Sequence, residues 1–347
     1  MTKNNVLWFQ QQVLNWYQQK GRKNLPWQIP IDPYRVWISE IMLQQTQVET
    51  VIPYFEKFLK QFPDIQTLSK AELDQVLHLW SGLGYYARAR NLYKTANILV
   101  TQHQAQLPQA LDELIQLPGI GRSTAGAILS LGFNHSAAIL DGNVKRVLCR
   151  YFCIAGWPGK TSVQKQLWQL VEKLTPYNGA RPFNQAMMDI GSLICKRSKP
   201  NCSECPLSKK CLSFNQSCIH IYPTKKPGKE MLIKKKVFLL IQNEQHHFLL
   251  IKRPPSGIWG AMWCFPEPMD LEAGNVPYQQ IALTHSFQHQ FSHFKMDASL
   301  YTATLTQHNM ISDSQRIIWY DPLKPETIGL PTPISIQLNK LIETIIK

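Results

Sequence analysis

The sequence predicts a mainly α-helical domain followed by a smaller α+β domain, and three observations lead to this prediction. Up to about residue 220, apolar residues recur at helical spacing between short connections that contain Gly and Pro. Residues 222–236 are rich in Lys, Pro and Gly and have no apolar periodicity, which is typical of a linker. Short β-rich runs follow at 237–242, 247–252 and 296–305, with a last helix expected near 334–346. We therefore expect domains at residues 1–221 and 237–347, joined by a basic linker.

The first domain is expected to be helical throughout. Asp32 and Pro33 suit an N-cap and a first helical residue, and an apolar stripe follows at positions 34, 37, 38, 41 and 42. Similar patterns predict further helices at about 47–61, 69–79, 86–103, 109–116, 122–133, 143–154, 162–174 and 182–195. The short connections between them leave no room for a sheet.

Composition indicates the class of partner. The 347 residues include 37 Lys and Arg against 23 Asp and Glu, which gives a net charge of +14. Such an excess favours a polyanionic partner, nucleic acid first and an anionic membrane second; positive charge that serves only solubility is the alternative. The N-terminus lacks the apolar run of a signal peptide and no apolar span reaches membrane length, so we expect a cytoplasmic, nucleoid-associated protein without a membrane segment.

Four of the eight cysteines lie within residues 195–211 at the spacing C-x6-C-x2-C-x5-C. Disulfide frameworks are typical of short secreted chains, so clustered cysteines here indicate metal binding. Zinc sites usually pair two short knuckles, whereas a four-iron cluster accepts unequal gaps within one compact loop. The spacing favours a [4Fe-4S] cluster and leaves zinc open, with Cys195, Cys202, Cys205 and Cys211 as ligands. The loop also carries Lys196, Arg197, Lys199, Lys209 and Lys210, which can face phosphates.

Two carboxylates stand out as candidates for catalysis. Glu40 is the only charged residue in VWISEIMLQQTQV, and Val36 and Leu43 flank it on a helix, so its pKa is expected to be raised as a general acid requires. A Glu paired with an Arg or facing water is the alternative. Asp141 lies between an apolar run and a basic helix that contains Lys145 and Arg146. An ordinary N-cap is the alternative for Asp141.

The stretch LPGIGRSTAGAIL is a candidate phosphate-binding hairpin. Pro118, Gly119 and Gly121 predict a tight turn between two helices, with backbone amides free of side-chain cover. A plain turn between helices is the alternative.

Together these motifs resemble the helix-hairpin-helix DNA glycosylases of the endonuclease III superfamily. Within that superfamily, LPWQ, SEIMLQQTQV, WSGLGYYARARNL, GRSTAGAI, WPGK and FNQAMMDIG are similar to the MutY family of adenine glycosylases. The resemblance implies base-excision repair: hydrolysis of the N-glycosidic bond of adenine opposite 8-oxoguanine or guanine in duplex DNA. It also implies a [4Fe-4S] cluster in the loop and a Nudix-like C-terminal domain. The chain is expected to be a monomer.

The resemblance also assigns roles to residues. Glu40 corresponds to the acid that protonates the departing adenine, and Asp141 to the carboxylate that stabilises the oxocarbenium-like sugar. Ser123 stands where the glycosylase-lyases of the superfamily have a nucleophilic lysine, so a mainly monofunctional enzyme is expected. The implied DNA contacts are Gln44, Gln45, Tyr85, Gly119, Gly121, Ser123, Lys145 and Arg146.

In the second domain, RPPSGIWGAMWCFPE resembles a Nudix segment, but the acidic metal-binding helix that should follow is absent. The resemblance places recognition of 8-oxoguanine at HQFSHFKM, with Phe291, Ser292 and His293 as candidates; a plain β-strand is the alternative. Three other functions are alternatives: a glycosylase-lyase for oxidised pyrimidines, a non-catalytic iron-sulfur DNA-binding protein and a nucleotide-pool hydrolase. Ser123 argues against the lyase, and the pair Glu40 and Asp141 argues against a non-catalytic protein. The missing acidic helix argues against the hydrolase.

Overall fold

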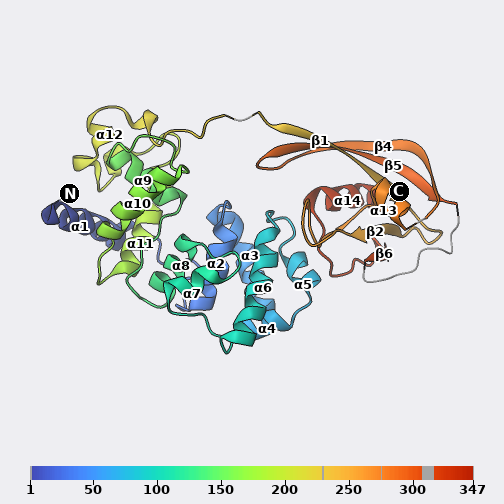
Figure 1. Cartoon of the computed structure of the whole chain (residues 1–347), viewed down its shortest axis with the longest axis horizontal. Helices are drawn as coiled ribbons and strands as arrows, with labels where there is room; N and C mark the ends of the chain where they lie inside the picture. The colour runs from blue at the N-terminus through green and yellow to red at the C-terminus, as the bar shows by residue number, and fades with distance from the viewer. Residues whose placement is uncertain (1, 229, 275, 307–315, 347) are drawn as a thin grey trace. The chain divides into compact units, whose positions relative to one another are not determined.

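The computed structural model describes residues 2–228, 230–274, 276–306 and 316–346. The chain forms two compact units (Figure 1). The helical unit comprises Met1–Ser69 and Lys94–Gly228, and the mixed unit comprises Lys70–Tyr93 and Lys229–Lys347. Compactness thus groups the residues differently from the predicted division at 222–236, and the predicted domain boundaries stay predictions.

The helical unit is built from helices joined by short connections. They are α1 (Lys3–Lys20), α2 (Pro33–Leu43), α3 (Val48–Gln61), α4 (Ile65–Lys70), the later part of α6 (Ala87–Gln102), α7 (Leu111–Gln116), α8 (Arg122–Ala127), α9 (Gly142–Tyr151), α10 (Thr161–Leu174), α11 (Ala180–Asp189) and α12 (Leu212–Asn215). Two helices end in a π-helical turn, α8 at Ile128–Gly132 and α11 at Ile190–Ile194. The expectation of a helical first part is confirmed.

One predicted helix is divided in two. The helix expected over 69–79 is instead α4 followed by α5 (Leu73–Leu79). Glu72 caps α5 through a capping box with Gln75, in which each side chain bonds the other's backbone amide. Because this cap supplies acceptors for amides that a continuous helix would bond internally, it marks the start of a separate helix.

Helix α2 begins where the sequence indicates. The Asp32 side chain accepts a hydrogen bond from the Arg35 amide at 2.9 Å, and Pro33 occupies the first turn, where its missing amide costs nothing. Seven of its eleven residues are buried, with Trp37 and Ile38 fully so. This helix is therefore enclosed by the unit around most of its circumference.

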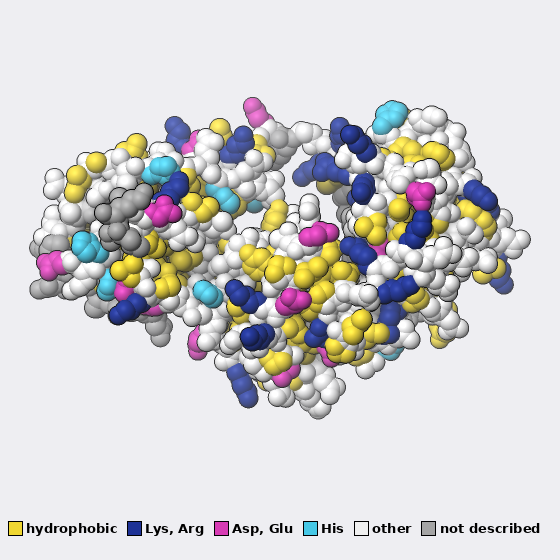
Figure 2. Space-filling model, turned by 180° about the vertical axis from the view of Figure 1, so that it is seen from behind, with side chains coloured by type: hydrophobic (Ala, Val, Ile, Leu, Met, Phe, Trp, Pro, Cys, Tyr) yellow, Lys and Arg dark blue, Asp and Glu magenta, His cyan; other side chains and the backbone are white. Residues whose placement is uncertain are grey.

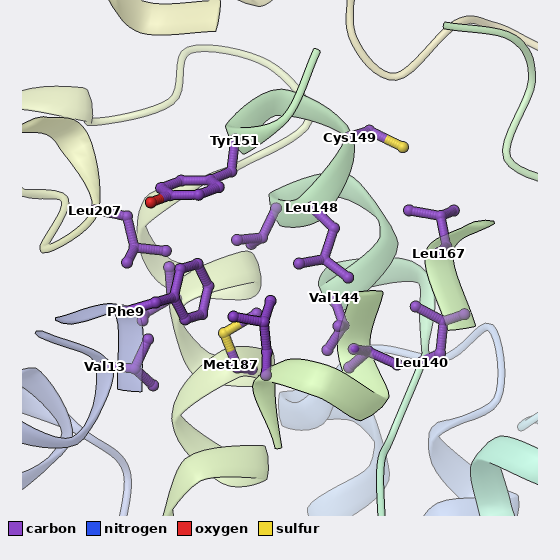
Figure 3. Close-up of a cluster of buried hydrophobic side chains, with 14 of the residues drawn as sticks. Phe9, Val13, Leu140, Val144, Leu148, Cys149, Tyr151, Leu167, Met187 and Leu207 are labelled. Carbon is purple, nitrogen blue, oxygen red and sulfur yellow. The ribbon is translucent and has the colours of Figure 1, made fainter. Parts of the chain in front are cut away.

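The core beside α9 joins elements that are distant in sequence. Phe9 and Val13 of α1 pack with Val144 and Leu148 of α9, and α10, α11 and Leu207 complete the cluster (Figure 3). A large apolar side chain contributes roughly 1.5–3 kcal/mol when fully buried. Packing on this scale fixes the orientation of α9 relative to its neighbours.

The mixed unit contains α5, two three-stranded sheets and helices α13 (Pro268–Ala273) and α14 (Thr332–Ile346). One sheet has the order β1-β5-β4, from Leu232–Ile241, Phe294–Leu305 and Tyr278–Gln290; β1 is parallel and β4 antiparallel to β5. The other is antiparallel with the order β3-β2-β6, from Trp263–Cys264, Phe248–Lys252 and Ile317–Tyr320. The predicted α+β class is confirmed.

The sheets differ from the sequence expectation in two places. Strand β1 begins at Leu232, so residues 232–236 are paired with β5 and are not linker. Strand β4 was not predicted, and most of its residues are exposed. Neither segment shows the buried-exposed alternation that marks a strand in sequence, because pairing with β5 and not burial holds them in place. Among the described residues, no helix has the length and apolar character needed to cross a membrane.

Candidate active site and nucleic-acid interface

Glu40 lies in the last turn of α2 and is partly buried. Burial and, to a smaller extent, the negative charge of Asp141 raise the pKa of its carboxyl group to about 8. In the described part of the chain no donor forms a hydrogen bond with this carboxyl group. A carboxyl group without donors in an apolar setting keeps its proton at neutral pH, which suits a general acid.

Asp141 is held in a different way at the N-terminus of α9. Its Oδ1 accepts from the Val144 amide at 2.7 Å and its Oδ2 from the Asn143 side-chain amide at 2.9 Å. Burial raises the pKa of Asp141, while these bonds and the charge of Arg146 act to lower it. The residue is thus an N-cap, as the sequence alternative proposed, and its donors favour the ionised form.

Helix α8 supports the backbone next to Asp141. The Ser123 hydroxyl accepts a hydrogen bond from the Leu140 amide at 3.1 Å, one residue before Asp141. Gly126 lies so close to Ala138 that a Cβ would meet its carbonyl oxygen at 2.1 Å. Ser123 was expected to contact DNA, and the structure gives it a backbone partner within the protein.

Arg146 connects Asp141 to the cysteine loop. Its guanidinium donates to Asn143 Oδ1 at 2.8 Å, to the Gly191 carbonyl at 2.6 Å and to the Cys195 carbonyl at 2.7 Å. Asn143 in turn donates to Asp141. Arg146 was also expected to contact DNA; these bonds link it through Asn143 to Asp141, a connection that the sequence did not indicate.

A cavity opens one helical turn before Glu40. Val36 lines it on the same face of α2, together with Trp27, Gln28 and Gln185. The Gln185 side chain donates to Asp189 Oδ1 at 3.0 Å, and Asp189 forms an ion pair with Arg22. An indole and two amides offer a stacking surface and hydrogen-bonding groups suited to a flat heterocycle. The motifs LPWQ and FNQAMMDIG contained these residues, but no single-residue signal identified the cavity.

The helix-hairpin-helix turn has the predicted form. Gly119 has φ +80°, a left-handed conformation that glycine adopts without strain, and it is exposed. A Cβ built on Gly121 would meet no atom within 4 Å, so the turn is open on that side. The amides at this turn are therefore accessible to a phosphate.

Three residues predicted to contact DNA occupy turns. Gln44 is the C-cap of α2 and donates to Thr124 Oγ1 at 3.4 Å, and the next residue, Gln45, is exposed with φ +60°. In the mixed unit, Tyr85 follows Gly84, has φ +51° and is 45% exposed. A left-handed backbone costs energy at residues other than glycine, and such strain collects at functional sites.

All four predicted cluster ligands line one cavity. Cys195, Cys202, Cys205 and Cys211 share it with Arg150 and with apolar residues such as Leu207. None forms a disulfide, and the Arg150 guanidinium donates to Cys195 Sγ at 3.3 Å. Within residues 2–228, 230–274, 276–306 and 316–346, no three Cys, His, Asp or Glu side chains lie close enough to share one metal ion.

A basic groove runs beside α9 and the cysteine loop. Its basic lining residues are Lys145, Arg146, Arg150, Arg197, Lys199, Lys225 and Lys226, and its lining contains no Asp or Glu. Figure 2 shows Lys and Arg side chains gathered on the surface of the helical unit. Lys210, by contrast, donates to Asn5 at 3.0 Å and lies over the Trp8 ring. The groove suits a polyanion such as a nucleic-acid backbone.

Phe291, Ser292 and His293 form the tip of the β4–β5 hairpin. The Phe291 amide donates to the Phe294 carbonyl at 2.9 Å, and the two rings stack at 4.4 Å between centroids. The Ser292 hydroxyl and His293 Nδ1 lie 3.2 Å apart and are exposed. These residues therefore belong to a turn and not to a continuous strand.

The acidic residues after the Nudix-like segment are engaged by cations. Glu267 forms ion pairs with Lys236 and Arg253, at 2.5 and 2.8 Å. Asp270 forms one with Arg253 at 3.0 Å. Their charge is already neutralised within the unit.

Comparison with known proteins agrees with this geometry. The family model of the HhH-GPD superfamily of base excision DNA repair proteins matches residues 38–173, and a NUDIX domain model matches residues 237–340. An adenine DNA glycosylase of Buchnera aphidicola subsp. Baizongia pistaciae is 45% identical over 343 residues, 97% of each chain. A human adenine DNA glycosylase is 33% identical, and the match covers 86% of this chain and 67% of the human protein.

Solved structures match the helical part. A thermostable thymine-DNA glycosylase superposes with a TM-score of 0.56 at 28% identity, covering 61% of this chain and 98% of its own. Endonuclease III in a non-covalent DNA complex gives 0.53 at 20% identity, covering 62% of this chain and 98% of its own, which shows a shared fold. The chain therefore belongs to the adenine DNA glycosylases, base-excision-repair enzymes of the HhH-GPD superfamily that cleave N-glycosyl bonds in DNA.

Proposed function

We propose that this glycosylase removes adenine opposite 8-oxoguanine or guanine in duplex DNA, with Glu40 as general acid and Asp141 as electrostatic stabiliser. The supporting observation is the unequal environment of the two carboxyl groups. Glu40 has no hydrogen-bond donor among the residues that the structure describes and a pKa of about 8, whereas Asp141 accepts bonds from Val144 and Asn143. Two interacting carboxyl groups share protons as a pair, and the group without donors retains the proton.

The proposed reaction follows from this division. Glu40 gives its proton to N7 of adenine, so the base leaves as a neutral molecule. The sugar then carries positive charge, which the Asp141 carboxylate stabilises while water attacks. Because the capping bonds already orient Asp141, little reorganisation is needed as the charge develops.

The adenine must leave the base stack to reach Glu40. We assign Gln44 and Gln45 of the helical unit to the gap it leaves, and Gln45 is exposed with φ +60°. Tyr85 of the mixed unit is a separate proposed contact for DNA, with φ +51°. The cavity with Trp27 and Gln28 is the proposed site for the extruded base. Gly119, Gly121, Lys145 and the basic groove are the proposed contacts for the phosphates.

The same proposal covers monofunctional chemistry. A lyase step requires an amine that attacks the sugar, and Ser123 offers a hydroxyl that already accepts a bond from Leu140. Strand cleavage is therefore expected to be weak compared with base release.

Cys195, Cys202, Cys205 and Cys211 are the proposed ligands of a [4Fe-4S] cluster. The residues fit such a group, because four free thiols face one cavity and Arg150 can donate to a thiolate. A four-iron cluster takes one cysteine thiolate at each iron, and four cysteines that line one cavity suit such a group. When bound, the cluster supplies a rigid link between segments of the loop.

We assign recognition of 8-oxoguanine to Phe291, Ser292 and His293. A hydroxyl can donate to the extra carbonyl of this base or accept from its N7-H, and the hairpin tip leaves Ser292 exposed. Asp270 and Glu267 are held in ion pairs, which supports a recognition role in place of metal-dependent hydrolysis.

The test is single-turnover release of adenine from duplexes that carry adenine opposite 8-oxoguanine, guanine or thymine. We expect release from the first two and little from the third. Glu40→Gln should lower the rate by about 10²–10⁴-fold while DNA binding persists. Glu49→Gln, in the exposed first turn of α3, is the matched control and should keep full activity. Equal release by wild type and Glu40→Gln would exclude the proposed acid.

A further inference from the structure

Two cysteines outside the proposed cluster set lie close together. Among the described residues, Cys153 and Cys218 are free, only partly buried and absent from the cavity of the four ligands. Cys149 and Cys264 are also outside the set, but both are buried. Cys153 and Cys218 are therefore the pair of non-ligand thiols that a reagent in solution can reach.

Their sulfur atoms converge on one acceptor. Cys153 Sγ lies 3.8 Å and Cys218 Sγ 3.9 Å from the same atom, Oε1 of Gln216. The pKa of Cys153 is raised by burial and then by the Cys218 thiol, both as a hydrogen-bond partner and as a charge. The two sulfur atoms are therefore close neighbours.

The backbone at or next to each cysteine has a left-handed conformation, which costs energy for residues other than glycine. Cys153 has φ +50° and Ser217, directly before Cys218, has φ +54°. Hydrogen bonds fix both turns: the Ile154 amide donates to the Cys149 carbonyl at 3.0 Å and the Cys218 amide to the Ser213 carbonyl at 2.8 Å. A residue other than glycine keeps such a φ only where its surroundings enforce it. The two thiols are therefore positioned by the fold and do not meet by chance motion of flexible ends.

The two cysteines lie on either side of the cysteine loop in the sequence. Cys153 follows the C-terminal end of α9, whose N-cap is Asp141. Cys218 follows α12, which begins directly after Cys211 and packs against α9. A bond between them would close a loop that contains all four proposed cluster ligands.

We propose that Cys153 and Cys218 form a reversible disulfide that clasps the cysteine loop to the end of α9, with a peroxide as oxidant. One thiol attacks the peroxide, the O–O bond breaks, and a sulfenic acid and one water are produced. The second thiol attacks that sulfur, an S–S bond forms and a second water leaves. Two thiols and hydrogen peroxide thus give one disulfide and two waters. A small thiol restores both groups by exchange.

The clasp constrains the unfolded chain more than the folded one, because the sulfurs already lie near each other in the fold. Disulfides in reducing compartments are usually transient and redox-sensing, which agrees with an exposed and reversible pair. The expected consequences of oxidation are a higher melting temperature and slower loss of iron.

The experiment uses the full-length protein purified with its iron under argon. It is treated with hydrogen peroxide at a concentration that leaves the absorbance near 400 nm unchanged. Peptide mapping should then show a Cys153–Cys218 crosslink, with the loss of two hydrogens, that dithiothreitol reverses. Oxidation should raise Tm by several degrees and slow the release of iron to a chelator several-fold.

Cys218→Ser and Cys153→Ser should each abolish the crosslink and the rise in Tm, while Cys264→Ala should retain both. A crosslink between other cysteines, stable sulfinic acid at these two positions, or an unreacted pair after peroxide treatment would each overturn the proposal. A crosslink that forms without any change in Tm or iron release would refute the clasp.

Discussion

Glu40 and Asp141 are both carboxyl groups next to apolar segments, and burial raises the pKa of each, yet their hydrogen-bond partners differ. Glu40 lies at the end of a helix, where backbone amides are already bonded, and it has no donor among the described residues. Asp141 lies at the start of a helix, where unpaired amides face it, and Val144 and Asn143 both donate to it. The end of the helix at which a carboxyl group lies thus determines whether backbone amides are available to stabilise its ionised form.

A large effect is expected from neutralising Asp141 without removing its cap. Asp141→Asn keeps an N-cap residue of similar strength, so Tm should change by little. The rate of adenine release should fall by about 10²–10³-fold, since the charge that stabilises the sugar is gone. Asp32→Asn is the matched control, because Asp32 caps α2 through the same kind of bond at 2.9 Å. Equal losses in both variants would show that capping, and not charge at the sugar, is what Asp141 provides.

The second prediction concerns pH. The pKa of Glu40 is raised to about 8, so its acid form declines above that pH. The single-turnover rate should fall about tenfold per pH unit above pH 8. Glu40→Gln should lose this alkaline limb. A limb that persists in the variant would assign the titration to another group.

The same shift has a consequence for stability. Glu40 binds its proton more tightly in the folded chain than in the unfolded chain, where its pKa is near 4.5. Its contribution to stability is therefore complete below about pH 4.5 and is lost as pH rises through about 8. The difference in Tm between Glu40→Gln and wild type should grow in favour of the variant across this range, as measured by thermal denaturation.

A smaller effect is expected from Arg146, which holds Asn143 and thereby Asp141. Arg146→Lys keeps the charge, but one ammonium group cannot replace the bonds to Asn143, Gly191 and Cys195. The rate of adenine release should fall about tenfold, roughly 1.4 kcal/mol in the barrier, with a weakened hold on iron. Kinetics and iron content measured on the same preparation test both effects. An unchanged rate would separate Asp141 from this network.

The smallest effect should come from Lys145, which lines the basic groove and has no assigned role in orienting Asp141. Lys145→Gln should weaken DNA binding and reduce the slope of log affinity against log salt by about 1. The rate at saturating enzyme should stay unchanged. Lys60→Gln, an exposed position on α3, removes the same charge and should leave the slope unaltered.

The sequence by itself determined the helical and mixed parts, the start of α2 and the set of residues worth testing. These features rest on local signals: Asp32 before Pro33, apolar spacing, and four cysteines within seventeen residues. The family is confirmed by comparison with relatives, and the fold class by the structure. The unusual setting of Glu40 was also visible, since one carboxylate in an apolar helix is a local pattern. The roles assigned to individual site residues remain predictions.

The tertiary structure alone decided how those residues cooperate. The sequence shows neither that Asp141 raises the pKa of Glu40, nor that Ser123 supports Leu140, nor that Arg146 links Asn143 to Cys195. It also missed β4 and the first residues of β1, which are held by pairing with β5. Local patterns record the preferences of neighbouring residues, whereas electrostatic coupling, hydrogen bonds between distant segments and strand pairing depend on which segments the folded chain brings together.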